Sequence, residues 1–127
     1  VRKDFPGGFP GDERNAFTAE GRTQAENTMF NWTSRLLHWR QGNEVITKGS
    51  QTQFIPYKGV YVIARQYKGK TVMTILNGKR EEATVAVKRY AEIIGNTKTA
   101  KDITNGRNVA IGEDFKLRPR QTMVLEF

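Results

Sequence analysis

The first notable absence from this chain is cysteine. None of the 127 residues is a cysteine, which excludes disulfides, thiolate nucleophiles and zinc sites built on thiolates. Histidine occurs once, at position 38, so no multi-histidine metal site can form and at most one catalytic imidazole is present. No spacing forces a carboxylate next to His38, and we expect its ring to be solvated on a helix surface. The sequence therefore predicts no metal site.

Long apolar runs and nucleotide-binding motifs are missing as well. No stretch approaches the ~18 apolar residues of a membrane span, and no signal-peptide pattern opens the chain, so we expect no membrane partner. The first residue is Val1, which fits a processed or excised segment of a longer protein. No glycine-rich loop links a strand to a helix, and Ser34 and Ser50 lack the strained turn of a nucleophile elbow. We predict no cofactor.

The charge of the chain is strongly positive. Lys+Arg number 21 against 13 Asp+Glu, a net charge of +8, which raises nucleic acid as a partner. Residues 1–43 contribute +1 and residues 44–127 contribute +7. The basic residues are scattered and fall mostly at turns, where solvated lysines also protect sheet edges. We expect a soluble basic surface and no nucleic-acid partner, with a basic nucleic-acid-binding domain as the less favoured alternative.

The opening of the chain is rich in glycine and proline. Residues 1–12 contain too much of both for a helix or a central strand, so a loop is predicted there. The loop region also holds Phe5, Phe9 and Phe17, which need surfaces to pack against. Such a loop is usually shaped around a site.

One long helix follows the loop. Thr23 and Glu26 have the spacing of a capping box, which predicts a helix from about Gln24 to Gln41, ended by a left-handed Gly42-Asn43 pair. Its apolar residues form two adjacent stripes, one of five residues and one of two, which implies two packing partners. The stripes consist of Ala25, Met29, Trp32, Leu36 and Trp39, and of Phe30 and Leu37.

From Glu44 onward the hydrophobic period is two, which is typical of strands. Turn signals separate about seven or eight short strands, the spacing expected of a β-sandwich. These turns are Tyr67-Lys68-Gly69-Lys70, Asn77-Gly78, Asn105-Gly106 and Gly112-Glu113-Asp114. Residues 89–94 can form one helical turn between strands. Alternation separates one face of each strand from the other: Val60, Val62 and Ala64; Thr71, Met73 and Ile75; Val85 and Val87. Met123, Leu125 and Phe127 are expected to form the inward face of the last strand. The predicted fold class is mainly β: a small antiparallel β-sandwich preceded by a loop and one long α-helix.

No catalytic constellation is evident in the residues. The cleavage of a glycosidic bond needs two carboxylates held across a cleft. No spacing fixes such a pair among the acidic residues of the opening loop or of the strand region, which are Asp4, Asp12, Glu13, Glu20, Glu81, Glu82, Glu113 and Asp114. Several aromatic side chains could stack on sugar rings but are more simply explained as packing residues. These are Trp32, Trp39, Tyr57, Tyr61, Tyr67 and Tyr90.

The opening motif resembles a known family. Arg2-Lys3-Asp4-Phe5-Pro6-Gly7-Gly8, followed by Asn15-Ala16-Phe17-Thr18 and a long helix, resembles the loop after the eighth barrel strand in the α-amylase superfamily of glycoside hydrolases. The nearest branch is the neopullulanase/cyclomaltodextrinase group. Residues 30–40 resemble the last barrel helix, residues 43–46 the hinge, and residues 54–77 the first strands of the C-terminal domain.

The resemblance implies a parent enzyme that cleaves α-glucans with retention, using an Asp nucleophile and a Glu acid/base. Those motifs are absent from this chain, so no catalytic residue is assigned to it. Arg2 and Asp4 would line the substrate mouth of the full-length parent, because barrel sites form at the loops after strands. Residues 1–43 would then be a barrel remnant and residues 44–127 the C-terminal β-sandwich domain. A periplasmic or extracellular bacterial location is implied for the parent.

The expected role is that of a non-catalytic fragment whose partner is the catalytic barrel of its own parent chain, with α-glucan as the parent's substrate. A homodimer through the helix is a further expectation, because the sandwich can cover only one apolar stripe. A carbohydrate-binding module that uses exposed aromatic residues is the alternative function.

Overall fold

The computed structural model describes residues 4–127, which form two compact units. The first unit ends at His38 and the second is Trp39–Phe127, so the boundary falls inside the long helix α1, Gln24–Gln41. Each unit is described by itself below. Among residues 4–127, no helix is both long and apolar enough to cross a membrane.

Helix α1 has the bounds that the sequence predicts. The capping box forms, since the Thr23 amide donates to Glu26 Oε2 at 2.8 Å and the Glu26 amide donates to Thr23 Oγ1 at 3.3 Å. No residue of α1 is buried. His38 is exposed, as expected, with its Nδ1 2.8 Å from the Ser34 carbonyl oxygen.

The expected helix terminator is wrong. Gly42 is not among the glycines with positive φ, and Asn43 has an extended backbone with φ −100°. Asn43 instead begins a second helix, α2 (Glu44–Lys48), because its side chain accepts from the Val45 amide at 3.0 Å. The prediction of strand periodicity from Glu44 onward therefore fails for these five residues, and the first strand begins at Ser50.

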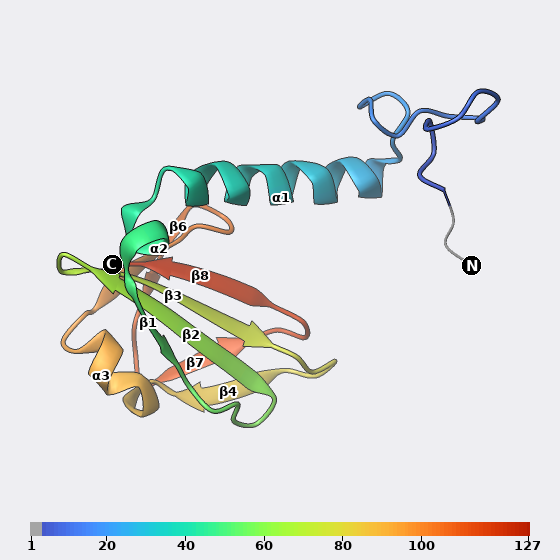
Figure 1. Cartoon of the computed structure of the whole chain (residues 1–127). Coiled ribbons are helices and arrows are strands. Elements are labelled where there is room, and N and C mark those ends of the chain that lie inside the picture. The colour runs from blue at the N-terminus through green and yellow to red at the C-terminus, as the bar shows by residue number, and fades with distance from the viewer. Residues whose placement is uncertain (1–3) are drawn as a thin grey trace. The chain divides into compact units, whose positions relative to one another are not determined.

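The rest of the second unit is built from eight antiparallel strands (Figure 1). Six of them form one sheet in the order β1-β2-β3-β8-β5-β6, and β4 and β7 form a second. The strands are β1 Ser50–Gln53, β2 Val60–Tyr67, β3 Lys70–Asn77, β4 Ala83–Ala86, β5 Thr99–Asp102, β6 Arg107–Ala110, β7 Asp114–Leu117 and β8 Thr122–Glu126. A 3₁₀ turn, η1 (Val87–Tyr90), and the short helix α3 (Ala91–Ile94) lie between β4 and β5, where the sequence predicts a helical turn.

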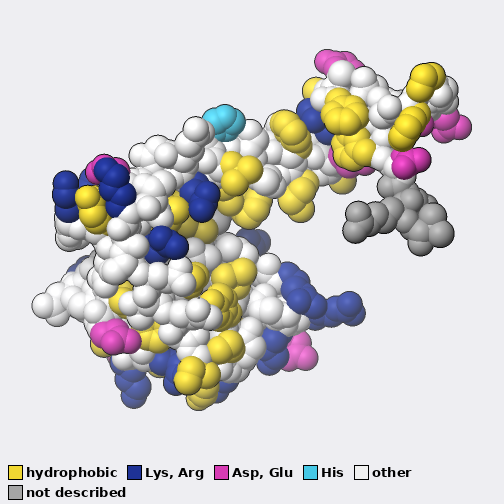
Figure 2. All heavy atoms as spheres, viewed as in Figure 1, with side chains coloured by type: hydrophobic (Ala, Val, Ile, Leu, Met, Phe, Trp, Pro, Cys, Tyr) yellow, Lys and Arg dark blue, Asp and Glu magenta, His cyan; other side chains and the backbone are white. Residues whose placement is uncertain are grey.

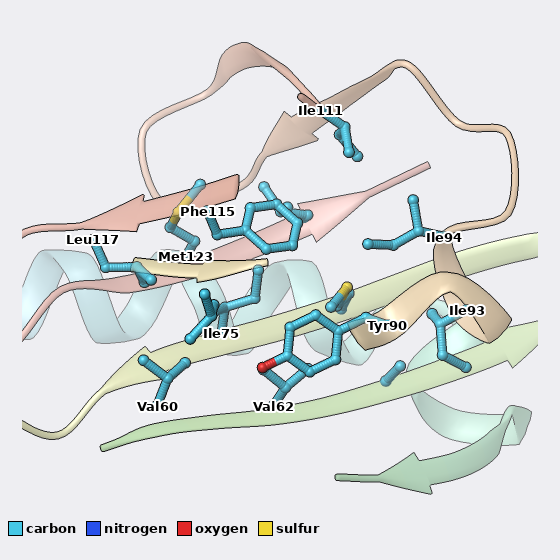
Figure 3. Close-up of a cluster of buried hydrophobic side chains, with 14 of the residues drawn as sticks. Val60, Val62, Ile75, Tyr90, Ile93, Ile94, Ile111, Phe115, Leu117 and Met123 are labelled. Carbon is cyan, nitrogen blue, oxygen red and sulfur yellow. The ribbon is translucent and has the colours of Figure 1, made fainter. Parts of the chain in front are cut away.

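The core of the second unit lies between the two layers (Figure 3). Alternate residues of β2, β3 and β8 face the β4–β7 pair, and Tyr90, Ile93 and Ile94 from η1 and α3 complete the second layer. Tyr90 is 1% exposed, and its ring meets Phe54 edge-on at a centroid distance of 4.9 Å. Of the residues on the alternating faces, Val87 and the last strand's Phe127 are only half-buried. The others are buried, and the predicted fold class is confirmed.

The opposite face of the six-stranded sheet has a smaller cluster. Val72 of β3 and Val124 of β8 pack with Val45 of α2, and Trp39 joins them from the last turn of α1. The Asn43 side chain donates to Glu126 at 3.0 Å, which fixes the start of α2 beside β8. This side of the sheet is therefore covered in part by the unit's own helices.

The β2–β3 hairpin forms where the sequence predicts a turn. Lys68 and Gly69 have φ of 48° and 77°, the paired left-handed conformation of a two-residue turn that matches strand twist. The β1–β2 connection ends in a second such turn at Lys58 and Gly59, with φ of 51° and 78°. Both turns hold the register of β2, in which Val60, Val62 and Ala64 face the core.

Candidate functional site

The loop and the first turns of α1 form the most distinctive surface of the first unit. Of the two residues predicted to line a substrate mouth, Arg2 lies outside the described residues and Asp4 is exposed, next to Phe5. Among residues 4–127, no group of three or more His, Asp or Glu side chains is placed to hold a metal ion. The roles of Arg2 and Asp4 stay predictions.

The loop is ordered by the Asp12 carboxylate. Its Oδ2 accepts from the Gly7 amide at 2.7 Å and from the Phe9 amide at 3.1 Å. These amide hydrogen bonds, that from Phe9 first, lower the pKa of Asp12. Gly7 has φ of 98°, and a Cβ there would come within 2.4 Å of Asn15 Oδ1, so only glycine fits this turn. Asp12 is therefore used as a turn cap.

A bidentate ion pair joins the loop to the helix. Arg14 donates to both oxygens of Glu26, at 2.6 and 2.8 Å, and to the Gly21 carbonyl at 3.0 Å. The hydrogen bonds from Arg14 and from the Thr23 amide lower the pKa of Glu26 to about 2. Glu26 thus stays ionised at pH values well below those at which a glutamate is usually protonated. The same carboxylate caps α1 and binds the Arg14 side chain of the loop. The sequence indicated the capping box but not Arg14.

An apolar hollow of about 360 Å³ opens between this loop and helix. Its floor is mainly hydrophobic, and the lining residues are Phe5, Ala16, Phe17, Arg22, Glu26, Met29 and Phe30. The rings of Phe5 and Phe17 lie 4.7 Å apart, and the Arg22 guanidinium carbon is 3.9 Å from the centre of the Phe30 ring. Figure 2 shows hydrophobic side chains gathered over the loop region.

The hollow is open to solvent. Phe5, Phe17, Met29 and Phe30 are between 51% and 65% exposed, and only Ala16, at 3%, is buried. The sequence leaves two ways to cover the second stripe of the helix: a second copy of the helix, or the opening loop folded back with Phe5, Phe9 and Phe17 as the cover. Two of these residues do line the hollow beside α1, whereas Phe9 does not line it and is 61% exposed.

The aromatic residues of the second unit are mostly used in packing. Tyr90 is buried, and Trp39, Tyr61 and Tyr67 are half-buried. Tyr57 is 41% exposed, but the Arg89 guanidinium lies 4.3 Å from its ring centre. In the first unit, Trp32 is 37% exposed. Of the six aromatics considered as sugar platforms, Tyr57 and Trp32 are the ones with the most open surface.

Four of the acidic residues considered in the second unit are exposed, and Asp102 is buried. Glu81, Glu82 and Glu113 lie outside the strands, whereas Asp114 is the first residue of β7. Asp102 is 1% exposed, and its oxygens accept from the Thr104 amide and hydroxyl, the Asn105 side chain and the Val124 amide at 2.8–3.3 Å. Sequence reasoning missed Asp102, although Asp followed by Thr and Asn in a turn is a signal for such capping.

The profile of a family described as "Cyclo-malto-dextrinase C-terminal domain" matches residues 51–126, more than half of the chain. The chain belongs to this family. The resemblance to the C-terminal part of an α-amylase-superfamily glycoside hydrolase is thereby confirmed.

Solved structures show the same fold in much longer proteins. An α-amylase from Geobacillus thermoleovorans, solved with acarbose, is 19% identical, with 83% of this chain and 23% of that chain covered at a TM-score of 0.68. An Anoxybacillus α-amylase is 14% identical, with 92% of this chain and 25% of that chain covered at a TM-score of 0.66. A maltogenic α-amylase from Thermotoga neapolitana is 20% identical, with 80% of this chain and 26% of that chain covered at a TM-score of 0.66. The chain thus spans about a quarter of the proteins that it resembles.

Proposed function

We propose that this chain is the non-catalytic C-terminal part of an α-glucan-hydrolysing enzyme and that it stabilises the catalytic barrel of that enzyme. The observation that carries the proposal is the family match over residues 51–126, which coincides with a sandwich that has a closed apolar core of its own. A domain with such a core can fold as a unit and offer its outer surfaces to a neighbour.

The use of the carboxylates supports a non-catalytic role. Asp12 caps a loop, Glu26 caps α1 and binds Arg14, and Asp102 caps the turn before β6. Retaining glycosidases need two carboxyl groups about 5–5.5 Å apart on either side of the scissile bond. These three carboxylates are instead held by amides, hydroxyls and a guanidinium, which makes each a structural group.

We further propose that residues 1–43 complete the barrel and that Arg2 and Asp4 line its substrate mouth. Asp4 is exposed and precedes Phe5, a lining residue of the apolar hollow, in the sequence, which supports a position at a surface that the full-length enzyme uses. We also propose that the boundary between this part and the sandwich falls at residues 43 and 44, where α2 begins; the compact units divide five residues earlier, at His38 and Trp39.

The proposal predicts that the chain alone hydrolyses no α-glucan. Incubation with cyclodextrin, pullulan or starch should release no reducing sugar above the buffer level, because the reaction needs two carboxylates held across the scissile bond, whereas Asp12, Glu26 and Asp102 are engaged in structural hydrogen bonds. The full-length enzyme serves as the positive control. Turnover by the purified chain, lost on substitution of one of its own acidic residues, would overturn the proposal.

A carbohydrate-binding module is the second candidate, and Tyr57 is the residue that favours it. Its ring is partly open on a rigid hairpin, next to Arg89. Titration with maltooligosaccharides separates the two functions: saturable binding that is lost in Tyr57→Ala favours the module. Binding to DNA that weakens steeply with salt would instead favour a nucleic-acid partner for the basic surface.

A further inference from the structure

One end of the sandwich carries an excess of positive charge. The β1–β2, β3–β4 and β7–β8 connections meet there, where β2 and β8 begin and β3 ends (Figure 1). Six exposed basic residues lie on these connections and on η1, against Glu81 and Glu82, so this end holds +4 of the +7 of residues 44–127. The basic residues are Lys58, Lys79, Arg80, Arg89, Arg118 and Arg120.

Backbone contacts hold the three connections together. The Gly78 amide donates to the Gly59 carbonyl at 2.9 Å, and the Arg120 amide donates to the Lys79 carbonyl at 2.9 Å. A Cβ on Gly59 would lie 2.4 Å from Lys79 Cγ, so the Lys79 side chain packs directly on the turn before β2. Among residues 4–127, Lys79 is the one member of the six that forms a salt bridge, with Glu81 at 3.6 Å. The positive charge is therefore fixed by the backbone and largely uncompensated.

The β1–β2 connection adds an apolar tip to this basic end. Ile55 is 82% exposed, more than any other large hydrophobic side chain that the structure describes. Tyr57, 41% exposed, follows two residues later, with the Arg89 guanidinium 4.3 Å from its ring centre. The base of the connection is anchored, because the Phe54 ring meets the buried Tyr90 ring edge-on at 4.9 Å. An anchored loop thus presents an apolar side chain to solvent next to several cations.

This composition is typical of a surface that docks on an anionic lipid bilayer. Each Lys or Arg near an anionic leaflet adds attraction, and an apolar tip can enter the headgroup region, where tyrosine rings are also favoured. Nucleic acid would use the cations and the ring but gains little from an exposed isoleucine, so Ile55 favours lipid. The expectation of no membrane partner rests on the absence of a spanning segment, which surface docking does not need.

We propose that the β1–β2 connection and the six basic residues dock this chain on an anionic lipid surface, with Ile55 at the depth of the headgroups. The inference goes beyond the proposed function and does not depend on hydrolysis. The docking surface is already formed, which lowers the entropy cost of binding. Binding should weaken as salt is added, because the charges are exposed and are screened beyond a Debye length.

The other end of β2 and β3 provides a matched control. Lys68 has the same turn conformation there as Lys58 has here, with φ of 48° against 51°. Each ammonium lies over the ring of the tyrosine that precedes it, 5.3 Å from the ring centre for Lys68 and 5.4 Å for Lys58. The double variants Lys58→Gln/Arg80→Gln and Lys68→Gln/Lys70→Gln therefore remove the same charge from opposite ends of one strand pair.

Vesicle flotation measures the binding of the 127-residue chain. Vesicles of phosphatidylcholine and phosphatidylglycerol in equal parts are compared with vesicles of phosphatidylcholine alone, and we expect tighter binding to the anionic ones. Lys58→Gln/Arg80→Gln should weaken this binding by at least about tenfold, and Lys68→Gln/Lys70→Gln by less than about threefold. Ile55→Ser should weaken it by at least about fivefold, since the apolar contact with the bilayer is lost. An unchanged thermal midpoint shows that each variant is folded.

Equal weakening by the two double variants would overturn the proposal, because the net charge and not this end of the sandwich would then direct binding. An unchanged affinity of Ile55→Ser would overturn it as well, since no apolar contact would exist. Salt-dependent binding to DNA without binding to vesicles would assign the basic end to nucleic acid instead. The full-length enzyme should bind the same vesicles with the same order of variants. Failure to bind in a full-length enzyme that hydrolyses α-glucan would overturn the docking surface and leave the proposed function intact.

Discussion

At the scale of single residues, two buried polar side chains join the turns of the sandwich. Asn77 is 3% exposed and donates from Nδ2 to the Glu81 carbonyl at 2.7 Å and to the Arg118 carbonyl at 2.9 Å. Its Oδ1 accepts from the Lys79 amide at 3.0 Å. Asn77 thus connects the turn after β3 with the turn before β8. Asp102 connects the turn before β6 with Val124 of β8. Loss of either side chain would remove hydrogen bonds that join backbone groups of separate segments.

Asn77→Asp should therefore destabilise the chain by about 2–3 kcal/mol. The new carboxylate would face two carbonyl oxygens that now accept hydrogen bonds, in a site with almost no access to water. Urea unfolding monitored by tryptophan fluorescence measures the change. Asn108→Asp, at an exposed position of β6, is the control, and its free energy of unfolding should stay within about 0.5 kcal/mol of that of the unsubstituted chain. Equal effects of the two variants would show that Asn77 has no special role.

At the scale of elements, the last strand has a larger part than its position in the sequence suggests. β8 lies inside the six-stranded sheet, between β3 and β5, and not at an edge. Met123, Val124 and Leu125 are all buried, so the strand faces one cluster on each side of the sheet. Burial of each such side chain is worth ~1.5–3 kcal/mol.

Truncation of the chain after Arg120 should abolish the cooperative thermal transition. The cut removes β8, opens both clusters and leaves β3 and β5 without their common neighbour. Differential scanning calorimetry measures the result. A chain that starts at Trp39 is the control, and it should keep a sharp transition because it contains the whole second unit. A truncated protein that melts at an unchanged temperature would contradict this assignment of the core.

At the scale of the whole molecule, the distribution of apolar surface differs between the two units. The second has a buried core, whereas the described part of the first exposes Phe5, Phe9, Phe17, Met29, Phe30 and Leu37 by half or more. Such surface favours association when the natural neighbour is missing. A homodimer through the helix is therefore still predicted for the isolated chain at high concentration.

Light scattering of the chain at increasing concentration tests this dimer. Trp32, 37% exposed on α1, is the residue to change, and Trp32→Asp should return the protein to the monomer mass. The same substitution should leave the thermal transition of the second unit unchanged, because Trp32 belongs to the first unit. If the unsubstituted 127-residue chain is monomeric at every concentration, the dimer is refuted and the assignment of the sandwich is unaffected.

Local patterns were sufficient for much of the fold. The capping box fixed the start of α1, period-two alternation identified β2, β3 and β8, and the Tyr67-Lys68-Gly69-Lys70 turn placed the β2–β3 hairpin. These features depend on residues a few positions apart, so they can be read without a tertiary structure. The failure is local too: Gly42-Asn43 has the composition of a helix terminator, which predicts strand from Glu44 onward, whereas the Asn43 side chain caps a second helix.

The sequence by itself determined the fold class, the absence of thiol chemistry and the family, because composition, periodicity and the opening motif are properties of the chain. Only the tertiary structure decided which side chains meet. The pairing of Arg14 with Glu26, the link from Asn77 to Arg118 and the central place of β8 join residues 12 to 54 positions apart. Such contacts arise from chain closure and packing, which no local pattern encodes. The apolar hollow belongs to the same class, since it exists only once the loop has folded against α1.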